Sequence, residues 1–333
     1  MGSNTKRFAV LALMAAGMCT VLATSASADP VAEAAKTPKA KTSLSLVSNP
    51  FVLPASNPDE AEASAQCPKN RTLLSGGALS NTPVPVGPPP PILDTEIYRS
   101  GPDGNGWIVR YDNDADVNLQ PSVQAICLKD ELKVKGTPGK PKAISKVTEM
   151  STSFALPADT APTNGVAQLD VACPEGTKVA GGGASFGVIG DVRLQESGPQ
   201  GNGWHVRYDN DEPVAVTALA SALCLKSKLK VKKLPGKDKA RSKFEQVDRG
   251  VTLPPAATNS GRARFTVGCP DGTTVVGGGG KIGSAIPLPD NNFQLEESGA
   301  VGNAWQVTFE NDEAVAQSAT VHALCLKNKL KVK

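Results

Sequence analysis

One composite pattern occurs three times in the chain and constrains the fold more than any other feature. Each copy contains a Cys-Pro step, a Gly-Gly pair, a tryptophan, an acidic turn with Asn-Asp, and a closing Ala-hydrophobic-Cys-Leu-Lys stretch. The copies run from Cys67 to Lys135, from Cys173 to Lys232 and from Cys269 to Lys333. A residue type present in every copy belongs to the shared architecture, whereas a residue confined to one copy is not a shared catalytic group.

The first 28 residues have the pattern of a secretory signal peptide. A basic start at Lys6-Arg7 precedes an apolar stretch over 9–21, and Ala26-Ser27-Ala28 gives a small-x-small site, so we expect cleavage after Ala28. Cys19 raises the alternative of a lipid-modified cysteine, but Met18 stands where a small residue normally precedes such a cysteine. No other segment is long and apolar enough to predict a membrane-spanning helix. We therefore expect a secreted, extracellular protein.

Six cysteines follow the signal, two in each copy. Paired cysteines in an exported chain indicate disulfides. Metal binding is the weaker alternative, because the sequence contains no Cys-x-x-Cys and only 2 histidines. The repetition predicts one disulfide per copy, namely Cys67–Cys127, Cys173–Cys224 and Cys269–Cys325.

Proline-glycine junctions divide the mature chain. We expect a flexible tether over 29–42, followed by three β-repeats over 43–135, 143–232 and 240–333. Basic residues concentrate at the two junctions between repeats, although the formal net charge of the whole chain is only +3. Bulk charge therefore does not indicate a nucleic-acid partner.

Alternating apolar and polar residues predict strands. Ala167, Leu169 and Val171 lead into Cys173 with a period of two, and copy 3 repeats the alternation before its first cysteine. The closing stretch 222–225 is apolar on both faces, which is typical of a central strand. No segment has a helical period. The predicted fold is all-β, with three tandem small antiparallel β-sandwich or barrel domains, each closed by one disulfide.

The glycine runs and the tryptophans each have a structural and a functional interpretation. Runs 181–183 and 277–280 lack the following helix and the Gly-Lys-Ser/Thr ending of a phosphate loop, so they indicate bulges or close packing. Trp107, Trp204 and Trp305 suggest a sugar-binding platform. However, each shares its strand face with a valine and another aromatic residue, while the opposite face varies between copies. We therefore predict that they are structural core.

The acidic turns after the tryptophan strands are weak calcium candidates. Calcium takes six to eight oxygen ligands, of which one turn offers only some, and Asn and Asp also favour turns through bonds to their own backbone. We expect a turn-forming role and no cofactor, with calcium as the alternative. The candidate ligands are Asp112, Asp114, Asp116, Asp209, Asp211, Glu212, Glu310, Asp312 and Glu313.

Catalytic motifs are not evident. His205 and His322 each occur in one copy only, and neither accompanies a nucleophile motif such as Gly-x-Ser-x-Gly. We predict no catalytic residue, and an active site confined to one copy stays the alternative. The loop after the glycines differs between copies, at Pro83–Pro91, 187–191 and 284–292. Such loops carry specificity in many scaffolds, but they also tolerate insertions without function.

A resemblance follows from the motifs taken together. The chain resembles a repeat of uncharacterised secreted actinobacterial proteins with the pattern CPxGT…GGG…GW…N…ALC, and the resemblance covers all three repeats. It implies an exported bacterial protein and assigns no activity. Copy 1 departs most, with Lys69-Asn70 and Ser75 at motif positions. In copy 2 the matching residues are Cys173-Pro174-Glu175-Gly176-Thr177, Gly181 to Gly183, Gly203-Trp204, Asn210 and Ala222-Leu223-Cys224.

The preferred hypothesis is a non-enzymatic extracellular protein with a structural or binding role in the cell envelope or extracellular matrix. Three weak sites on one chain gain avidity, and the Lys-rich junctions suit an anionic wall polymer; a glycan or an extracellular protein are the other candidate partners. Two alternatives are a secreted enzyme with a site in one repeat and an inhibitor of an extracellular protease. The inhibitor hypothesis rests on the loop Pro83–Pro91.

Overall fold

The regular elements are β-strands, as the alternation in the sequence predicts, and no α-helix occurs in the part of the chain described below. The computed structural model describes residues 37–55, 60–80, 95–113, 117–137, 139–160, 165–186, 192–233, 236, 239–257, 261–283 and 293–332. The unit that begins at Thr37 is compact. Each repeat, taken from here on together with the short strand at its start, supplies eight strands in the same order. In this sense β1–β8 belong to copy 1, β9–β16 to copy 2 and β17–β24 to copy 3.

The strand bounds show the correspondence between copies. Copy 1 has β1 (Lys39–Lys41), β2 (Leu44–Pro50), β3 (Ala61–Gln66), β4 (Arg71–Leu79), β5 (Thr95–Asp103), β6 (Gly106–Asn113), β7 (Ser122–Lys129) and β8 (Glu131–Lys135). Copy 2 has β9 (Lys142–Ile144), β10 (Val147–Leu156), β11 (Ala167–Ala172), β12 (Thr177–Phe186), β13 (Val192–Gln200), β14 (Gly203–Asn210), β15 (Val216–Lys226) and β16 (Lys228–Lys232). Copy 3 has β17 (Lys239–Arg241), β18 (Phe244–Leu253), β19 (Ala263–Gly268), β20 (Thr273–Ile282), β21 (Phe293–Val301), β22 (Ala304–Asn311), β23 (Gln317–Lys327) and β24 (Lys329–Lys331).

Within each copy, six strands form two three-stranded antiparallel sheets that pack against each other. In copy 1 these sheets are β2-β7-β4 and β3-β6-β5, and the disulfide Cys67–Cys127 joins them. Cys173–Cys224 and Cys269–Cys325 occupy the same place in the other copies. The pairing predicted from the repetition is therefore present, and the sandwich-like arrangement agrees with the expected all-β class.

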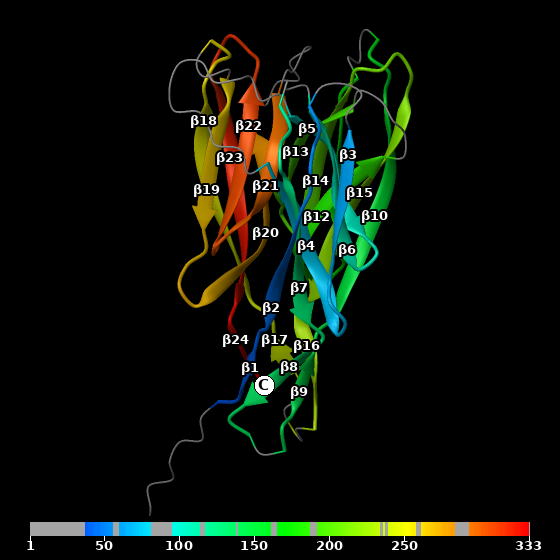
Figure 1. Ribbon diagram of the computed structural model, residues 1–333. Helices are drawn as coiled ribbons and strands as arrows, with labels where there is room; N and C mark the ends of the chain where they lie inside the picture. The colour runs from blue at the N-terminus through cyan, green and yellow to red at the C-terminus, as the bar shows by residue number, and fades with distance from the viewer. Residues whose placement is uncertain are drawn as a thin grey trace, which may run out of the picture. The chain divides into compact units, whose positions relative to one another are not determined.

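The copies are not separate domains, and the structure corrects this part of the prediction. Each large sheet combines three strands of one copy with three of another, in the orders β10-β15-β12-β5-β6-β3, β11-β14-β13-β20-β23-β18 and β19-β22-β21-β4-β7-β2 (Figure 1). Each join, which we call a seam, consists of one residue pair. The seam pairs are Ala184–Ser100, Ser197–Gly280 and Ser298–Ala78. Because copy 3 joins copy 1 as well as copy 2, the three copies close into a ring.

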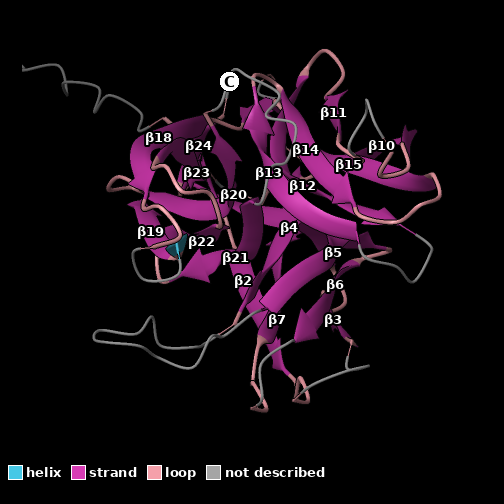
Figure 2. Cartoon of the chain, turned by 90° about the horizontal axis from the view of Figure 1, so that it is seen from above, coloured by secondary structure: helices cyan, strands magenta, loops and turns pink. Residues whose placement is uncertain are grey.

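Strands β4, β12 and β20 meet at the centre of this ring (Figure 2). The first residue of each glycine run lies there: a Cβ on Gly181 would come closer than 3.0 Å to Ser75, and a Cβ on Gly277 closer than 3.0 Å to the carbonyl oxygen of Ala180. The third glycine of a run, such as Gly183, lies equally close to the neighbouring copy's carbonyl at the seam. The glycine runs thus allow close approach between copies, and the register shift at Val179 and Gly181 marks the expected bulge.

The tryptophans lie in the core that the copies share. Trp107, Trp204 and Trp305 are 1–2% exposed. Each covers one glycine of its own copy, and these glycines are Gly76, Gly182 and Gly278. Each indole Nε1 donates a hydrogen bond of 3.0–3.1 Å to a serine hydroxyl, and that serine is the residue that forms the seam. The indoles are inaccessible to a sugar, so they are core residues that also position the seams.

The structure bears on export only through the disulfides, which form in oxidising compartments. Among the residues that the structure covers, no helix is long and apolar enough to cross a membrane. The expected signal peptide and Cys19 lie outside the described residues. Both stay predictions from the sequence.

Candidate functional site

A fourth, smaller sheet gathers the segments that lead from one copy into the next. Its strand order is β17-β16-β9-β8-β1-β24, and these strands lie together at the lower end of the ribbon in Figure 1. A bridge between Ala240 and Val332 connects the two outer strands, so the sheet closes into a small barrel. Alternate residues point inward, because a strand has a period of two. The buried interior consists of Ala40, Leu132, Val134, Ala143, Leu229, Val231, Ala240, Leu330 and Val332.

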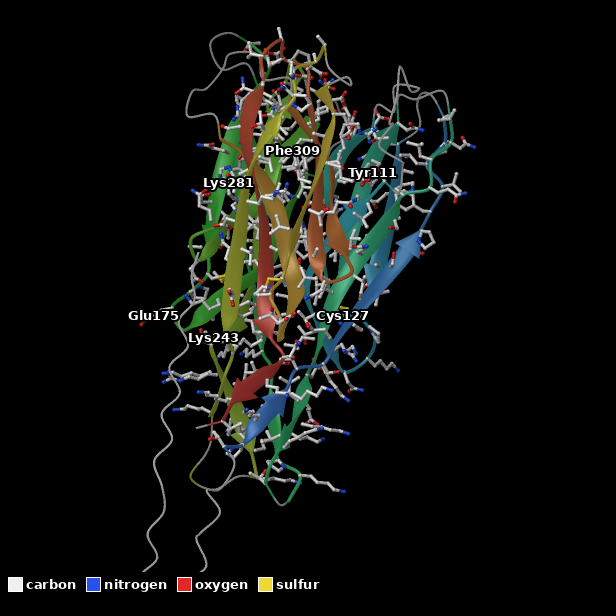
Figure 3. The ribbon with its side chains drawn as sticks, turned by 90° about the vertical axis from the view of Figure 1, so that its left-hand side faces the viewer. Tyr111, Cys127, Glu175, Lys243, Lys281 and Phe309 are labelled. Carbon is white, nitrogen blue, oxygen red and sulfur yellow. A yellow bond between two sulfur atoms is a disulfide. The ribbon has the colours of Figure 1, made fainter. Side chains whose placement is uncertain are left out.

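The outward residues of the barrel are almost all cationic. Twelve of them are exposed lysine or arginine side chains, and in the described strands the other outward residues are Glu131 and Ile144. Figure 3 shows nitrogen-tipped side chains projecting around this part of the molecule. We call the twelve the cationic collar: Lys39, Lys41, Lys133, Lys135, Lys142, Lys228, Lys230, Lys232, Lys239, Arg241, Lys329 and Lys331.

Many collar residues face another cation directly across the strands. Side chains opposite each other in an antiparallel pair have Cβ atoms about 5 Å apart, and like charges there are destabilising. Within the described strands, one ion pair relieves the collar, between Lys142 and Glu131. The like-charged opposite pairs are Lys39–Lys331, Lys41–Lys329, Lys39–Lys135, Lys228–Arg241, Lys230–Lys239, Lys232–Lys142 and Lys133–Lys142.

The barrel also corrects the predicted tether. Residues 39–41 fall within the segment expected to be flexible, but they form strand β1 between β8 and β24. Three residues are too few for a convincing periodic signal. A comparison of copies would have found the strand, because Lys39-Ala40-Lys41 matches Lys142-Ala143-Ile144 and Lys239-Ala240-Arg241.

The acidic turns are organised by their asparagines. In copy 2, Nδ2 of Asn210 donates to the carbonyl oxygens of Pro157 (2.6 Å) and Val214 (3.0 Å). Asn113 and Asn311 make the equivalent pairs of bonds in the other copies. These bonds close the turn and tie it to the proline that ends an earlier strand, which agrees with the turn-forming role.

The calcium candidates do not converge. Asp112 accepts a hydrogen bond from the hydroxyl of Tyr98 at 2.9 Å, Asp209 accepts one from Gln195 at 3.0 Å, and Asp211 pairs with Arg193 at 3.3 Å. No group of three or more His, Cys, Asp or Glu side chains suited to a metal ion occurs among the residues with described positions, which exclude Asp114 and Asp116. Glu212, Glu310, Asp312 and Glu313 belong to no such group either. The expectation of no cofactor stays a prediction.

The two histidines pair with acids. His205 lies between Asp170 (Nδ1 to carboxylate, 2.7 Å) and Glu196 (Nε2 to carboxylate, 3.3 Å), and Nδ1 of His322 lies 2.8 Å from Asp248. Burial alone would raise the pKa of Asp248, but hydrogen bonds from His322 and Gln246 and the charge of His322 lower it overall. Neither histidine bonds a serine, threonine or cysteine side chain within the described ranges.

The sequence did not reveal the buried charges beside the seams. Glu296 and Glu297 on β21 are fully buried, and they pair with Arg262 (2.5 Å) and Arg264 (3.0 Å). Burial, and secondarily the neighbouring acids Glu310 and Glu297, raises the pKa of Glu296 well above its usual range, against the opposing charge of Arg262. Glu297 also accepts a hydrogen bond from the backbone N–H of Ser80 at 2.9 Å, which gives it a structural role between copies 3 and 1. The variable loops 187–191 and 284–292 lie outside the described residues, as does Pro83–Pro91.

Two pockets lie where the barrel meets the large sheets. One, of about 620 Å³, is lined by residues of copies 2 and 3, including Lys178, Lys228 and Arg241. The other, of about 440 Å³, lies among Lys129 and the collar residues Lys41, Lys133 and Lys135 of copy 1. Both pockets thus border cationic residues of the barrel.

The fold and this site together define a disulfide-bonded all-β protein with a closed cationic barrel. No family model matches the chain, and no curated protein is similar to it.

Proposed function

We propose that the protein is a non-enzymatic extracellular binding protein whose cationic collar binds an anionic polymer of the cell envelope. The observation that carries this proposal is the set of like charges held opposite one another around the barrel. This arrangement destabilises the free protein, and anionic groups placed between the cations remove that cost.

The geometry of the collar favours a flexible polymer as the partner. Cations point outward from all six strands, so a chain can wrap around the barrel, whereas a planar membrane can contact one side only. Eleven of the twelve are lysines, which act as point charges and suit a partner without fixed geometry. The outward positions of the described barrel strands include no aromatic residue, so base stacking does not favour single-stranded nucleic acid.

Export through the signal peptide and membership of the secreted actinobacterial repeat proteins are part of the same proposal. The disulfides support the extracellular location, because such bonds persist in oxidising compartments.

Titration of the mature protein with long-chain polyphosphate and with poly-γ-glutamate tests the proposal, and anionic vesicles and duplex DNA serve as comparisons. Release of counterions predicts that affinity for the polymers falls steeply with salt, with a log–log slope of magnitude about 3 or more. Lys39→Glu/Lys230→Glu should weaken binding and reduce the slope, and Lys39→Arg/Lys230→Arg should preserve both. No binding to either polymer, or stronger binding to vesicles or DNA, would overturn the proposed function.

A further inference from the structure

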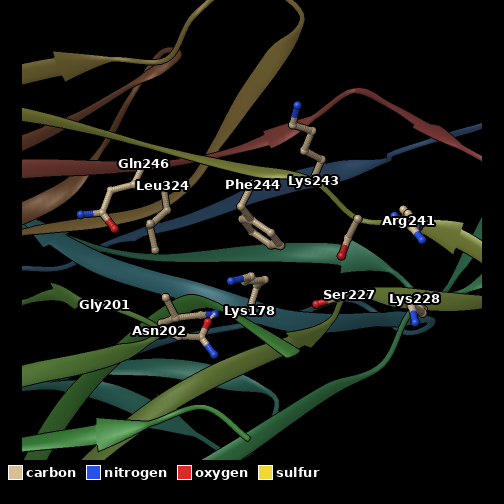
Figure 4. Close-up of a pocket in the computed structure, with 12 residues that line it drawn as sticks. Lys178, Gly201, Asn202, Ser227, Lys228, Arg241, Lys243, Phe244, Gln246 and Leu324 are labelled. Atoms are coloured by element: carbon tan, nitrogen blue, oxygen red, sulfur yellow. Dashed lines mark hydrogen bonds between the residues drawn. The ribbon is translucent and has the colours of Figure 1, made fainter. Parts of the chain in front are cut away.

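The larger of the two pockets differs from the rest of the collar in the side chains that line it. It lies where β15 continues into β16 and β17 into β18, and Lys178, Ser227, Lys228 and Arg241 line it. In Figure 4 these side chains border the same space, while Lys243 projects from the rim. Its volume of about 620 Å³ is in the range of small-molecule sites.

The strand registers provide an internal comparison with the other two junctions. Lys178 occupies the position that Thr72 has in copy 1 and Thr274 has in copy 3. The residue before each of these three pairs with the last lysine of the neighbouring strand, and the pairs are Thr177–Lys226, Arg71–Lys129 and Thr273–Lys327. At those junctions the threonine hydroxyl bonds the residue that matches Ser227: Thr72 donates to Asp130 at 2.7 Å, and Thr274 donates to Asn328 at 2.6 Å.

At the junction of copies 2 and 3 this internal bond is absent. Lys178 and Ser227 occupy the two positions, and neither side chain forms a hydrogen bond or ion pair with another residue that the structure describes. At the other two junctions a threonine donor is bonded to an acceptor side chain. Here the two positions hold an ammonium group and a hydroxyl group that can both donate, and both residues line the pocket.

The facing barrel positions also differ between the junctions, and only the junction of copies 1 and 2 lacks a pair of cations there. Lys228 lies directly opposite Arg241, where the junction of copies 1 and 2 has Glu131 opposite Ile144, and the junction of copies 3 and 1 has Lys329 opposite Lys41. Arg241 is the only arginine among the twelve collar cations. A guanidinium presents a fork of donors that matches the oxygens of phosphate or sulfate, which an ammonium does not.

We propose that this pocket binds one tetrahedral oxyanion group, a phosphate or a sulfate. Arg241 makes the bidentate contact, Lys178 and Lys228 supply charge from two sides, and the hydroxyl of Ser227 donates a further hydrogen bond. The proposal deepens the proposed function and rests on it in one respect, since the oxyanion is then a group of the polymer that the collar holds. The pocket chemistry is the same for a free anion.

Calorimetric titration of the full mature protein with inorganic phosphate and with sulfate tests the site, followed by titration with polyphosphate. We expect one saturable phosphate or sulfate site per chain. Lys178→Thr/Arg241→Ile introduces the residues found at the junction of copies 1 and 2, so it should fold, and it should weaken binding of the free anion at least about tenfold. Lys39→Thr/Lys135→Thr removes two collar charges on β1 and β8, strands that do not pair with the pocket strands β16 and β17. This control should change that affinity less than about twofold.

Arg241→Lys keeps the charge and removes the fork, so a several-fold loss with an unchanged melting temperature supports the bidentate contact and remains informative if the double variant misfolds. The absence of a saturable site for free phosphate or sulfate, or an equal loss in the pocket and control variants, would overturn the inference. If only the pocket inference fails, the protein still binds the polymers. If the proposed function fails, the protein binds phosphate or sulfate but does not bind the polymers.

Discussion

Reversing two collar charges should stabilise the protein while weakening its binding. Lys39 lies opposite both Lys331 and Lys135, and Lys230 lies opposite Lys239. Lys39→Glu/Lys230→Glu therefore converts three repulsive pairs into attractive ones. All the positions involved are exposed strand positions, so the substitution does not disturb the barrel interior.

The size of the effect follows from Coulomb's law. Two unit charges about 10 Å apart in water interact by about 0.4 kcal/mol, so reversing the sign of one charge changes each pair by about 0.8 kcal/mol. Three pairs give about 2 kcal/mol at low ionic strength, or a rise in melting temperature of about 4 °C for a chain of this size. At 0.15 M salt the Debye length of about 8 Å reduces the gain to below about 1 kcal/mol.

Denaturant unfolding of the oxidised protein at about 10 mM and about 500 mM sodium chloride measures this effect. Wild type should gain stability with salt, and the variant should gain less. The control Lys39→Arg/Lys230→Arg preserves the like charges and should behave as wild type. A variant that is no more stable than wild type at low salt would refute the repulsion argument, as would a gain that persists undiminished at high salt.

Three further predictions concern the scaffold. Replacing Cys173 and Cys224 by alanine opens a 51-residue loop and should cost about 4 kcal/mol in denaturant unfolding, so a loss below about 1 kcal/mol would contradict the entropic estimate. Gly278→Ala forces a methyl group into the indole above it and should cost at least about 2 kcal/mol, whereas Gly250→Ala meets no atom and should be nearly neutral; similar melting temperatures for both would be inconsistent with the packing. Burial, reinforced by the next acid along the turn, raises the pKa of Asp209 to about 7. Its neutral form is therefore favoured on folding, and the stability this contributes is present below about pH 4 and lost as pH rises through 7. Asp209→Asn should match wild type near pH 4 and exceed it at pH 8, and pH-independent differences in melting temperature would exclude this linkage.

Alternation predicted the longer strands and the buried tryptophans, because each of these depends on a residue's own neighbours in the chain. The threefold repetition predicted the disulfide pairs. The three-residue strand β1 was not predicted. The sequence does not predict which strand pairs with the outer strand of a three-stranded sheet. Ser100 could pair within copy 1 or with another copy, since every copy presents the same small residues at its edges, and the structure pairs Ser100 with Ala184. Because the copies are so similar at these edges, the sequence does not indicate which edges pair.

The sequence predicted only part of the charge of the candidate site, namely the concentration of basic residues at the two junctions between repeats. A net charge of +3 does not suggest polyanion binding, because acidic residues elsewhere compensate the lysines. Short alternating segments, such as Lys228–Lys232, place one cation at every second position, and only the closure of the barrel brings segments from all three copies together. The collar therefore depends on tertiary structure, and no single segment predicts it.

The edge-to-edge pairing of the copies has a consequence for assembly. The three seams are equivalent, so a polypeptide that carried one copy would expose both halves of a seam, and three such polypeptides would complete the ring with cyclic symmetry. The natural chain therefore contains, in one polypeptide, the three units that a cyclic trimer would contain as separate subunits. Covalent linkage holds its copies at a high local concentration, so the ring, and with it the collar that needs all three junctions, survives dilution that would dissociate three separate subunits.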